Sequence, residues 1–101
     1  MSKKNDYQDY LLESLKKPKE AAAYLNAALE EESKVFLLAL RNVVEAWGGV
    51  GEVAKKTNLN RVNLYRMLSK KGNPELGSLE NILKALGLKL SVEVEKVKKA
   101  S

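Results

Sequence analysis

Between residues 61 and 69 lie the side chains best suited to contact a nucleic acid. If the apolar Leu64, Met67 and Leu68 face inward, the 3.6-residue period of a helix turns a basic and aromatic set outward. Arginine can grip O6 and N7 of guanine, valine can pack on the methyl group of thymine, and tyrosine can reach a phosphate or a base edge. The outward set is Arg61, Val62, Tyr65, Arg66 and Ser69. This pattern favours a helix that reads DNA over an ordinary solvated helix face.

The segment that must position this face is residues 50–69, which predict two short helices joined by a tight turn. A small residue, Ala54, stands where the two helices should touch. Asn58 tolerates the left-handed backbone that such a turn requires, and Leu59 can fill the gap between the helices. Asn60 is a favoured N-cap for the second helix. Together these features are typical of a helix-turn-helix, whose second helix lies in the major groove of DNA.

Phosphate contacts are expected around the reading helix. Lys70 and Lys71 follow it in a basic turn, and Ser78 is predicted to cap the last helix and to bring its first amides towards the DNA backbone. The predicted DNA-binding residues are therefore Asn60, Arg61, Val62, Tyr65, Arg66, Ser69, Lys70, Lys71 and Ser78.

The composition argues against catalysis. The 101 residues, 45% hydrophobic and 31% charged, fit one globular domain. The absence of cysteine and histidine removes disulfides, thiolate chemistry and the commonest metal ligand and general base. We expect no enzyme activity, no metal and no cofactor, and Glu30-Glu31-Glu32 is interpreted as a solvated helix end. Neither a signal peptide nor a membrane-spanning run is recognised, so a cytoplasmic protein is expected.

Charge is distributed unevenly along the chain. Residues 1–47 carry 7 Lys and Arg against 8 Asp and Glu, a net charge of −1, whereas residues 48–101 carry 11 against 5, a net charge of +6. The basic half holds the predicted helix-turn-helix. A polyanionic partner is the natural expectation for that half, because neutralised phosphates release counterions. The alternative is simply a basic, soluble surface.

Two N-terminal helices are expected before this motif. The first should run from Asp6 to Lys17 and end there because Pro18 disfavours helical geometry in the residue before it. The second, rich in alanine, should begin at Pro18. The expected inward side chains are Tyr7, Leu11 and Leu15 in the first helix and Ala21, Leu25, Ala28 and Leu29 in the second.

Two further helices complete the predicted helical core. One should be capped by Ser33, end at Gly48-Gly49 and lie centrally, because its apolar surface is wider than one stripe. The other should be capped by Ser78 and closed by Gly87. The expected buried side chains are Phe36, Leu37, Leu38, Leu40, Val43, Val44 and Trp47 in the first and Leu79, Ile82, Leu83 and Leu86 in the second.

After Gly87 the hydrophobic period changes from helical to alternating. Leu88, Leu90, Val92 and Val94 alternate with polar residues, which predicts a half-buried strand over residues 88–95. No second strand is found in the chain. We therefore expect this strand to pair with the same strand of another copy, with those four residues forming a dimer interface and burying against the last helix.

The order of three sequence blocks adds a family resemblance. AAAYLNAALEE, NLYRMLSKKGNPELGSLENILKALG and LKLSVEV closely resemble the addiction-module antidote proteins, HigA-like antitoxins with a helix-turn-helix of the Cro/repressor type. Asn58 stands where that family usually has Gly, and Asn60 where it usually has Ser. The resemblance covers nearly the whole chain. It implies an all-α single domain with a helical DNA-binding core over 33–87, a helical extension over 1–32 and a dimerisation strand over 88–95.

By this resemblance the protein would repress transcription from its own operator as a dimer and neutralise a small, ribonuclease-like toxin of the RelE/HigB type. The acidic surface of residues 6–32 could cover the basic surface of such a toxin. The alternative interpretation of that surface is an ordinary solvated layer over the central helix. A second functional class also stays open: a protein-interaction antitoxin or adaptor that has lost DNA binding.

Overall fold

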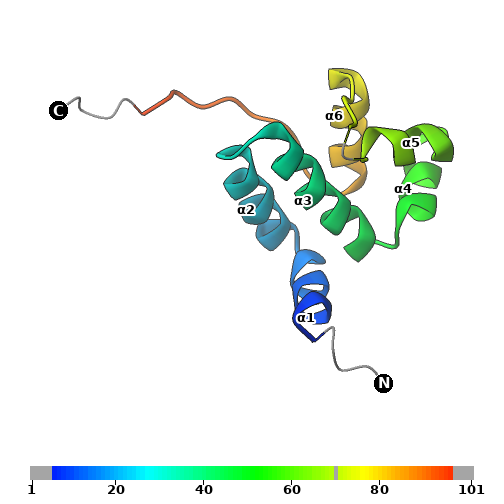
Figure 1. The fold of residues 1–101 in the computed structure, drawn as a ribbon, viewed down its shortest axis with the longest axis horizontal. Coiled ribbons are helices and arrows are strands. Elements are labelled where there is room, and N and C mark those ends of the chain that lie inside the picture. The colour runs from blue at the N-terminus through cyan, green and yellow to red at the C-terminus, as the bar shows by residue number, and fades with distance from the viewer. Residues whose placement is uncertain (1–5, 70, 97–101) are drawn as a thin grey trace.

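The computed structural model describes residues 6–69 and 71–96, which form six helices and no strand (Figure 1). None of the described helices is long and apolar enough to cross a membrane. In chain order the helices are α1 (Asp6–Leu15), α2 (Pro18–Leu29), α3 (Ser33–Ala46), α4 (Val50–Thr57), α5 (Arg61–Met67) and α6 (Leu76–Ala85).

Helix α3 lies at the centre of the fold, as the width of its apolar surface predicts. Helices α1 and α2 pack against it on one side, and α4 connects it to α5 and α6 on the other (Figure 1). Its buried side chains point in several directions: Phe36, Leu37, Ala39, Leu40, Val43, Val44 and Ala46. They belong to one core that also contains Leu15, Leu25, Leu64 and Ile82. Both the N-terminal helices and the α4–α6 group therefore depend on α3 for their packing.

Three expected core residues are exposed instead. Tyr7 is 76% exposed, Leu29 55% and Leu38 53%. In α1 the partly buried and buried leucines lie on one side of the helix, and Tyr7 falls outside the strip that α2 and α3 cover. Leu38 lies beside a surface groove that Leu68 and Ser69 also line, and Leu29 lies beside another groove. Helical periodicity shows which side of a helix is apolar, but it does not show how much of that side the neighbouring helices cover.

Polar contacts fasten the N-terminal helices to α3. Trp47, directly after α3, donates its indole Nε1–H to the carbonyl of Leu15 at 2.9 Å. Asn42 of α3 donates to the hydroxyl of Tyr24 in α2 at 2.8 Å. α1 ends at Leu15, two residues earlier than predicted, and the extended backbone of Lys17 (φ −92°, ψ 124°) is what Pro18 requires of its predecessor.

The predicted caps of α3 and α6 are wrong by one and three residues. Ser33 is the first helical residue of α3, and Glu32 is its N-cap, with φ −71° and ψ 157°. Ser78 lies inside the first turn of α6, whose N-cap is Glu75 with φ −72° and ψ 155°. Neither glutamate accepts a side-chain cap bond, but a carboxylate at this end suits the positive pole of the helix dipole. Serine is a favoured cap residue in both predictions. In the structure the extended backbone that precedes each helix lies one residue earlier in α3 and three residues earlier in α6.

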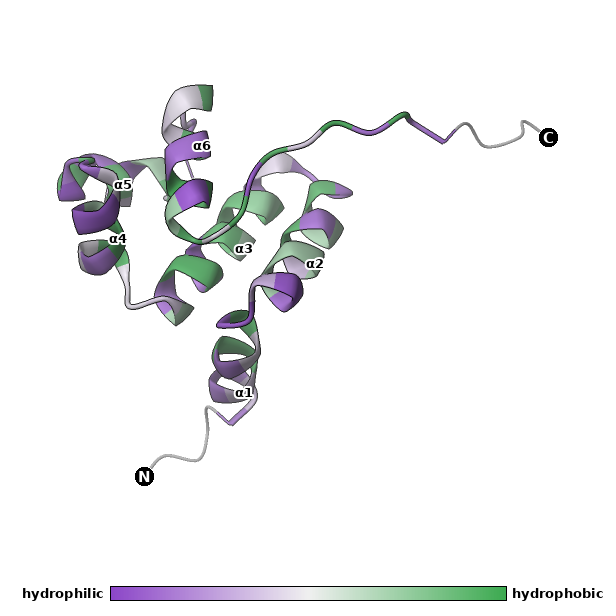
Figure 2. Ribbon diagram, turned by 180° about the vertical axis from the view of Figure 1, so that it is seen from behind, coloured by the Kyte–Doolittle hydropathy of each residue, from purple (hydrophilic) through white to green (hydrophobic). Residues whose placement is uncertain are grey.

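The predicted strand over residues 88–95 is absent from the described part of the chain. Residues 88–96 follow α6 without regular secondary structure and leave the helical body past α2 (Figure 2). The amide of Leu88 donates to the carbonyl of Leu83 at 2.8 Å, and Gly87 takes the left-handed conformation (φ 80°) that ends the helix. A strand requires a hydrogen-bonded neighbour, and the described residues of one chain provide none.

Candidate functional site

The α4–turn–α5 unit is held by hydrogen bonds from its own turn. Asn58 adopts the predicted left-handed conformation (φ 64°), and its amide donates to the carbonyl of Ala54 at 3.0 Å. Asn60 is the N-cap of α5, as predicted: its side-chain oxygen accepts from the amides of Val62 at 2.8 Å and Asn63 at 3.2 Å. The orientation of α5 relative to α4 is therefore fixed by local chemistry at the turn.

A buried threonine, which the sequence analysis missed, completes this turn. The Thr57 hydroxyl donates to the carbonyl of Val53 at 2.9 Å and accepts from the amide of Leu59 at 3.2 Å. Asn81 of α6 donates to the carbonyl of Thr57 at 3.4 Å, which ties the turn to the last helix. A threonine in the last turn of a helix is a weak sequence signal, because such a hydroxyl often bonds back to the helix without any tertiary role.

Helix α5 has one buried side and one exposed side, as the periodicity predicts. Leu64 is fully buried and Leu68, the C-cap residue, is 2% exposed, while Met67 is partly buried. The exposed side carries Arg61, Val62, Tyr65 and Arg66. Val62 is 63% and Tyr65 55% exposed, although both side chains are hydrophobic enough to be buried. The side chains predicted to contact DNA are thus brought together on one accessible surface.

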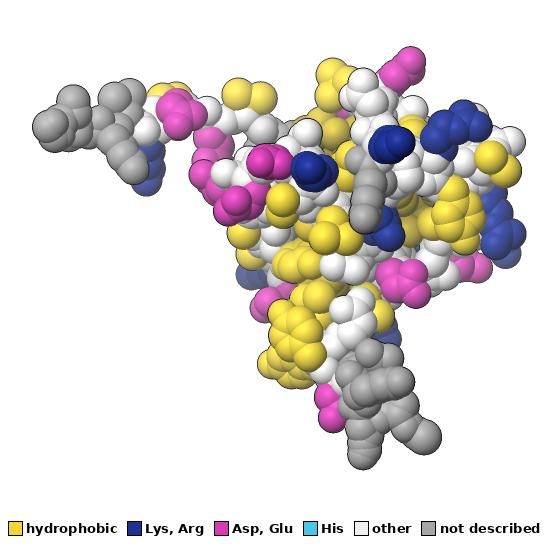
Figure 3. Space-filling view, viewed as in Figure 1, with side chains coloured by type: hydrophobic (Ala, Val, Ile, Leu, Met, Phe, Trp, Pro, Cys, Tyr) yellow, Lys and Arg dark blue, Asp and Glu magenta, His cyan; other side chains and the backbone are white. Residues whose placement is uncertain are grey.

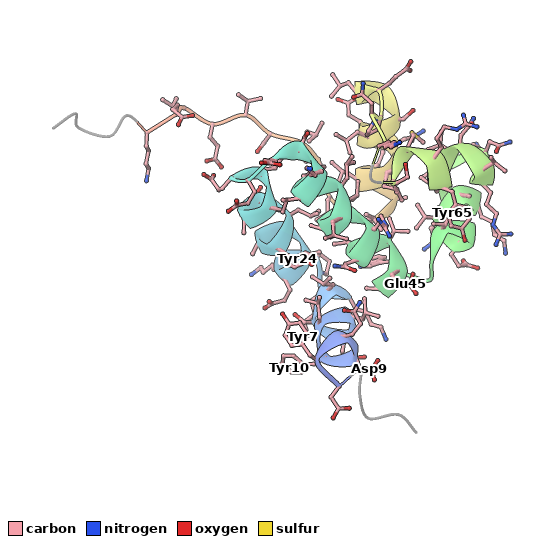
Figure 4. All side chains as sticks on the ribbon, viewed as in Figure 1. Tyr7, Asp9, Tyr10, Tyr24, Glu45 and Tyr65 are labelled. Carbon is pink, nitrogen blue, oxygen red and sulfur yellow. The ribbon has the colours of Figure 1, made fainter. Side chains whose placement is uncertain are left out.

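Arg61 lies along the start of α4. A Cβ atom placed on Gly51 would be 3.8 Å from the guanidinium carbon of Arg61, an ordinary van der Waals distance, so the two residues lie side by side. An open groove of about 760 Å³ lies between these helices and the end of α3, with Glu45, Arg61 and Tyr65 among its lining residues. In Figure 4, Tyr65 of α5 and Glu45 of α3 face this region from neighbouring helices. The exposed face of α5 therefore ends in a groove that is lined by both acidic and basic side chains.

The predicted phosphate contacts around α5 are only partly brought together. Ser69 is half-buried, and its hydroxyl donates to the carbonyl of Arg66 at 2.8 Å, so its proton is used within the protein. Ser78 is half-buried inside α6 rather than at its cap. Lys71 is exposed. Lys70 lies outside the described residues.

Arg41 is a second residue that the sequence analysis did not place at the site. It is exposed on α3, and it lines a groove with Tyr65, Leu68 and Ser69. It adds a cation beside α5 from a helix 20 or more residues earlier in the chain. No local pattern could have revealed this, because only the packing of α3 against the α4–α6 group brings the residues together.

Gly72 is required by close packing after α5. A Cβ atom at this position would lie 2.0 Å from the carbonyl oxygen of Met67, closer than any side chain could approach. Its amide donates to the carbonyl of Ser69 at 2.9 Å. The return of the chain from α5 towards α6 therefore depends on a glycine.

Basic and acidic side chains occupy different parts of the described surface. On the face shown in Figure 3, Lys and Arg gather over α4 to α6, and acidic side chains gather where α2 meets α3. Among the described residues only two ion pairs form, Lys16 with Glu13 at 3.2 Å and Lys55 with Glu52 at 3.5 Å, each between exposed neighbours on or next to one helix. The described residues contain no cluster of acidic side chains able to hold a metal ion.

Comparison with known proteins gives the family. Residues 3–94 match a family model described as "Probable addiction module antidote protein". The chain belongs to this antidote family. A relative in Haemophilus influenzae, described as an uncharacterized protein, is 32% identical over 82 residues, which is 80% of this chain and 84% of that protein. No solved structure gives a significant match. Membership confirms the antidote part of the predicted resemblance, and an antidote implies a toxin of some kind as its partner.

Proposed function

We propose that this antidote is also a transcriptional repressor that binds double-stranded DNA through α5. The observation that carries the proposal is the exposed set Arg61, Val62, Tyr65 and Arg66 on a helix whose other side is buried. In this arrangement α4–turn–α5 acts as a helix-turn-helix of the Cro/repressor type, with α5 in the major groove. The chain then acts in the cytoplasm as a binding protein rather than an enzyme.

The chemistry of the exposed face fits the edges of base pairs. Arg61 and Arg66 each offer a planar guanidinium to guanine, and Val62 offers an apolar surface to a thymine methyl. Arg66 Nη1 donates to Asn63 Oδ1 at 3.2 Å, which holds the guanidinium on the exposed side of α5. Lys71 and Arg41 flank the helix and are suited to phosphates, which position the protein without reading sequence.

We propose that the chain binds DNA as a dimer, which predicts an operator with two related half-sites. Two copies joined through Leu88, Leu90, Val92 and Val94 would present two α5 helices about one helical turn of DNA apart. The support is the exposure of Val92 (98%) and Val94 (94%) on an extended segment. The operator of such an autorepressor lies upstream of its own reading frame.

The DNA proposal is tested by titrating a DNA fragment from upstream of the reading frame with variant proteins. Arg61→Ala and Arg66→Ala should each weaken specific binding by about 1–3 kcal/mol if that arginine makes a two-bond base contact. Lys71→Ala should weaken binding to all sequences alike and reduce the salt slope by about 1. Lys19→Ala removes the same charge from the exposed start of α2 and serves as the control. Wild-type affinity in both arginine variants would show that α5 is not the DNA-binding face, and a wild-type protein that binds no DNA would favour the antidote without DNA binding.

The toxin partner is proposed to be a small ribonuclease of the RelE/HigB type that meets the acidic N-terminal helices. A ribonuclease must carry basic surface for RNA, and Asp6, Asp9 and Glu13 are exposed on α1. Tyr7 and Tyr10 are 76% and 75% exposed on the same helix, and exposed tyrosines are enriched at protein interfaces. In Figure 4 these tyrosines and Asp9 project from different sides of α1. Helix α1 thus offers aromatic contact on one side and negative charge on another.

Charge reversal at Asp9, Glu13 and Glu20 tests this contact, with the protein encoded by the adjacent reading frame as the probe. These side chains are exposed, so the helices should persist, and affinity should fall with a weaker dependence on salt. Reversal at Glu80, an exposed glutamate within α6, is the control. An unchanged affinity and salt slope would place the toxin elsewhere on the protein.

A further inference from the structure

A groove lined by five leucines, together with polar side chains such as Asn26 and Ser91, runs between α2 and the segment that follows α6. Its volume is about 250 Å³, and residues of α2, α3 and α6 form its walls together with the first residues after Gly87. A water molecule's share of liquid volume is about 30 Å³, so the groove can admit whole aliphatic side chains. The residues that matter most are Leu25, Asn26 and Leu29 of α2 and Leu88 and Leu90 of the segment.

The same segment carries the most exposed aliphatic side chains in the described chain. Leu88 and Leu90 line the groove, but Val92 is 98% and Val94 94% exposed. In an extended chain all four residues lie on one face, because the side-chain period is two. Figure 2 shows the segment continuing past α2 into solvent. The apolar face therefore begins on the protein's own groove and extends beyond it without a partner.

We propose that a second copy of this chain fills the groove, with the two C-terminal segments paired antiparallel about Val92. The partner's Val94 then lies beside Leu90 and over Leu29 of α2, and the two-fold axis repeats the contact on the other side. The inference rests on the dimer of the proposed function and assigns α2 as the surface that receives the partner. The sequence had suggested the last helix for this role.

Charge complementarity limits the registers in which the two segments can pair. With Val92 opposite the partner's Val92, Lys89 faces the partner's Glu95, and the symmetry makes this pairing twice. A shift of two residues towards the C-terminus would set Glu93 against the partner's Glu93, and like charges directly opposite are destabilising. A slip of one residue would set apolar side chains against polar ones and turn one segment's valines away from the groove. The Val92-centred register satisfies both the charges and the apolar face. A register centred on Ser91, with Lys89 facing the partner's Glu93 and Leu88 facing the partner's Val94, satisfies them too. In both registers the partner's Val94 lies beside a leucine that lines the groove together with Leu29.

The exposed state of Leu29 follows from this arrangement. Leu29 is 55% exposed at the end of α2, although the alanine-rich helix otherwise buries its apolar side. In a monomer the Leu29 side chain is exposed to solvent at the edge of an open groove. In the dimer the partner's Val94 covers it, so that the N-terminal helices become part of the interface between copies.

The absence of cysteine from the chain makes a direct test of this contact possible. The double variant Leu29→Cys with Val94→Cys should form a disulfide-linked dimer on mild oxidation, and dithiothreitol should reverse it. Val94→Cys alone should not, because the register separates the two Val94 positions by four residues, about 13 Å, beyond the reach of a disulfide. Leu38→Cys with Val94→Cys is the matched control, because Leu38 is 53% exposed but lies on α3.

A second measurement gives the energetic weight of Leu29 without relying on disulfide geometry. Leu29→Lys should raise the dimer dissociation constant in sedimentation equilibrium at least tenfold, whereas Leu38→Lys should leave it unchanged. Both side chains are exposed, so circular dichroism should show the same helix content. A dimer that Leu29→Lys leaves intact, without the Leu29–Val94 cross-link, would overturn the α2 contact but not the dimer. A wild-type monomer at tens of micromolar would overturn both, while DNA and toxin binding are tested separately.

Discussion

At the residue scale, the turn between α4 and α5 depends on three polar residues, Thr57, Asn58 and Asn60. Thr57 bonds back to α4 and accepts from Leu59, Asn58 supplies the left-handed backbone, and Asn60 caps α5. Each satisfies backbone groups that would otherwise lack a partner at a helix end. Since α5 has only seven residues, its stability depends on these contacts and on the burial of Leu64 and Leu68 more than on helix propensity.

Asn60→Ala should lower the free energy of unfolding by about 1 kcal/mol, because the amides of Val62 and Asn63 lose their acceptor. Chemical denaturation followed by circular dichroism measures the change. Asn63→Ala is the control, since that exposed side chain accepts only a surface bond from Arg66. If Asn60→Ala and the wild type have the same free energy of unfolding, water satisfies the amides of Val62 and Asn63 as well as the Asn60 side chain does.

At the scale of elements, α1 is attached through the end of α3 rather than by its own first turn. Leu15 is buried, while Tyr7 and Tyr10 are exposed. The hydrogen bond from Trp47 Nε1 reaches the carbonyl of Leu15, at the point where α1 ends. Helix α1 therefore packs against the rest of the protein at its C-terminal end. Its exposed tyrosines and aspartates lie on the same helix, closer to its N-terminal end.

Trp47→Phe should loosen α1 while leaving α5 unchanged, because it removes this hydrogen bond and keeps most of the aromatic contact. Loss of a bond of this kind costs about 0.5–1.5 kcal/mol. Amide hydrogen exchange should become several-fold faster in α1. Tyr24→Phe, which removes the bond from Asn42, should instead affect α2. Unaltered protection of α1 would show that apolar packing alone holds it.

At the scale of the whole molecule, the acidic N-terminal helices and the basic α4–α6 group share one core. α3 contributes buried residues to both sides, and the core joins Leu15 and Leu25 to Leu64 and Ile82. The two proposed partners, DNA at α5 and a basic toxin at α1, would therefore contact different sides of α3. The charge difference between the halves would direct each partner to its own side without requiring separate domains.

A chain containing only residues 33–101 should fail to fold cooperatively. It lacks the buried Leu15 and Leu25, each worth about 1.5–3 kcal/mol, and exposes the side of α3 that they cover. That loss is comparable to the whole stability of a small domain, about 5–15 kcal/mol. Thermal unfolding by circular dichroism is the measurement, with a chain of residues 6–101 as the control. A sharp, reversible transition in the short chain would show that residues 33–87 form an independent core.

The amino-acid sequence by itself determined the features that depend on neighbours along the chain. We predicted the left-handed Asn58, the Asn60 cap, the glycines that end α3 and α6, and the buried and exposed sides of α5. These predictions hold because backbone sterics, capping and helical period act over only a few residues. The six helices themselves followed from the same local rules.

Only the tertiary structure decided what depends on which elements lie side by side. Tyr7, Leu29 and Leu38 fit an inward stripe but are exposed, because burial requires a neighbouring helix at that position. Arg41 joins the site at α5 from a distant helix, and the alternating residues after Gly87 form no strand in one chain. Periodicity indicates which face of an element is apolar, whereas the packing of the other elements, or of a second copy, determines what covers that face.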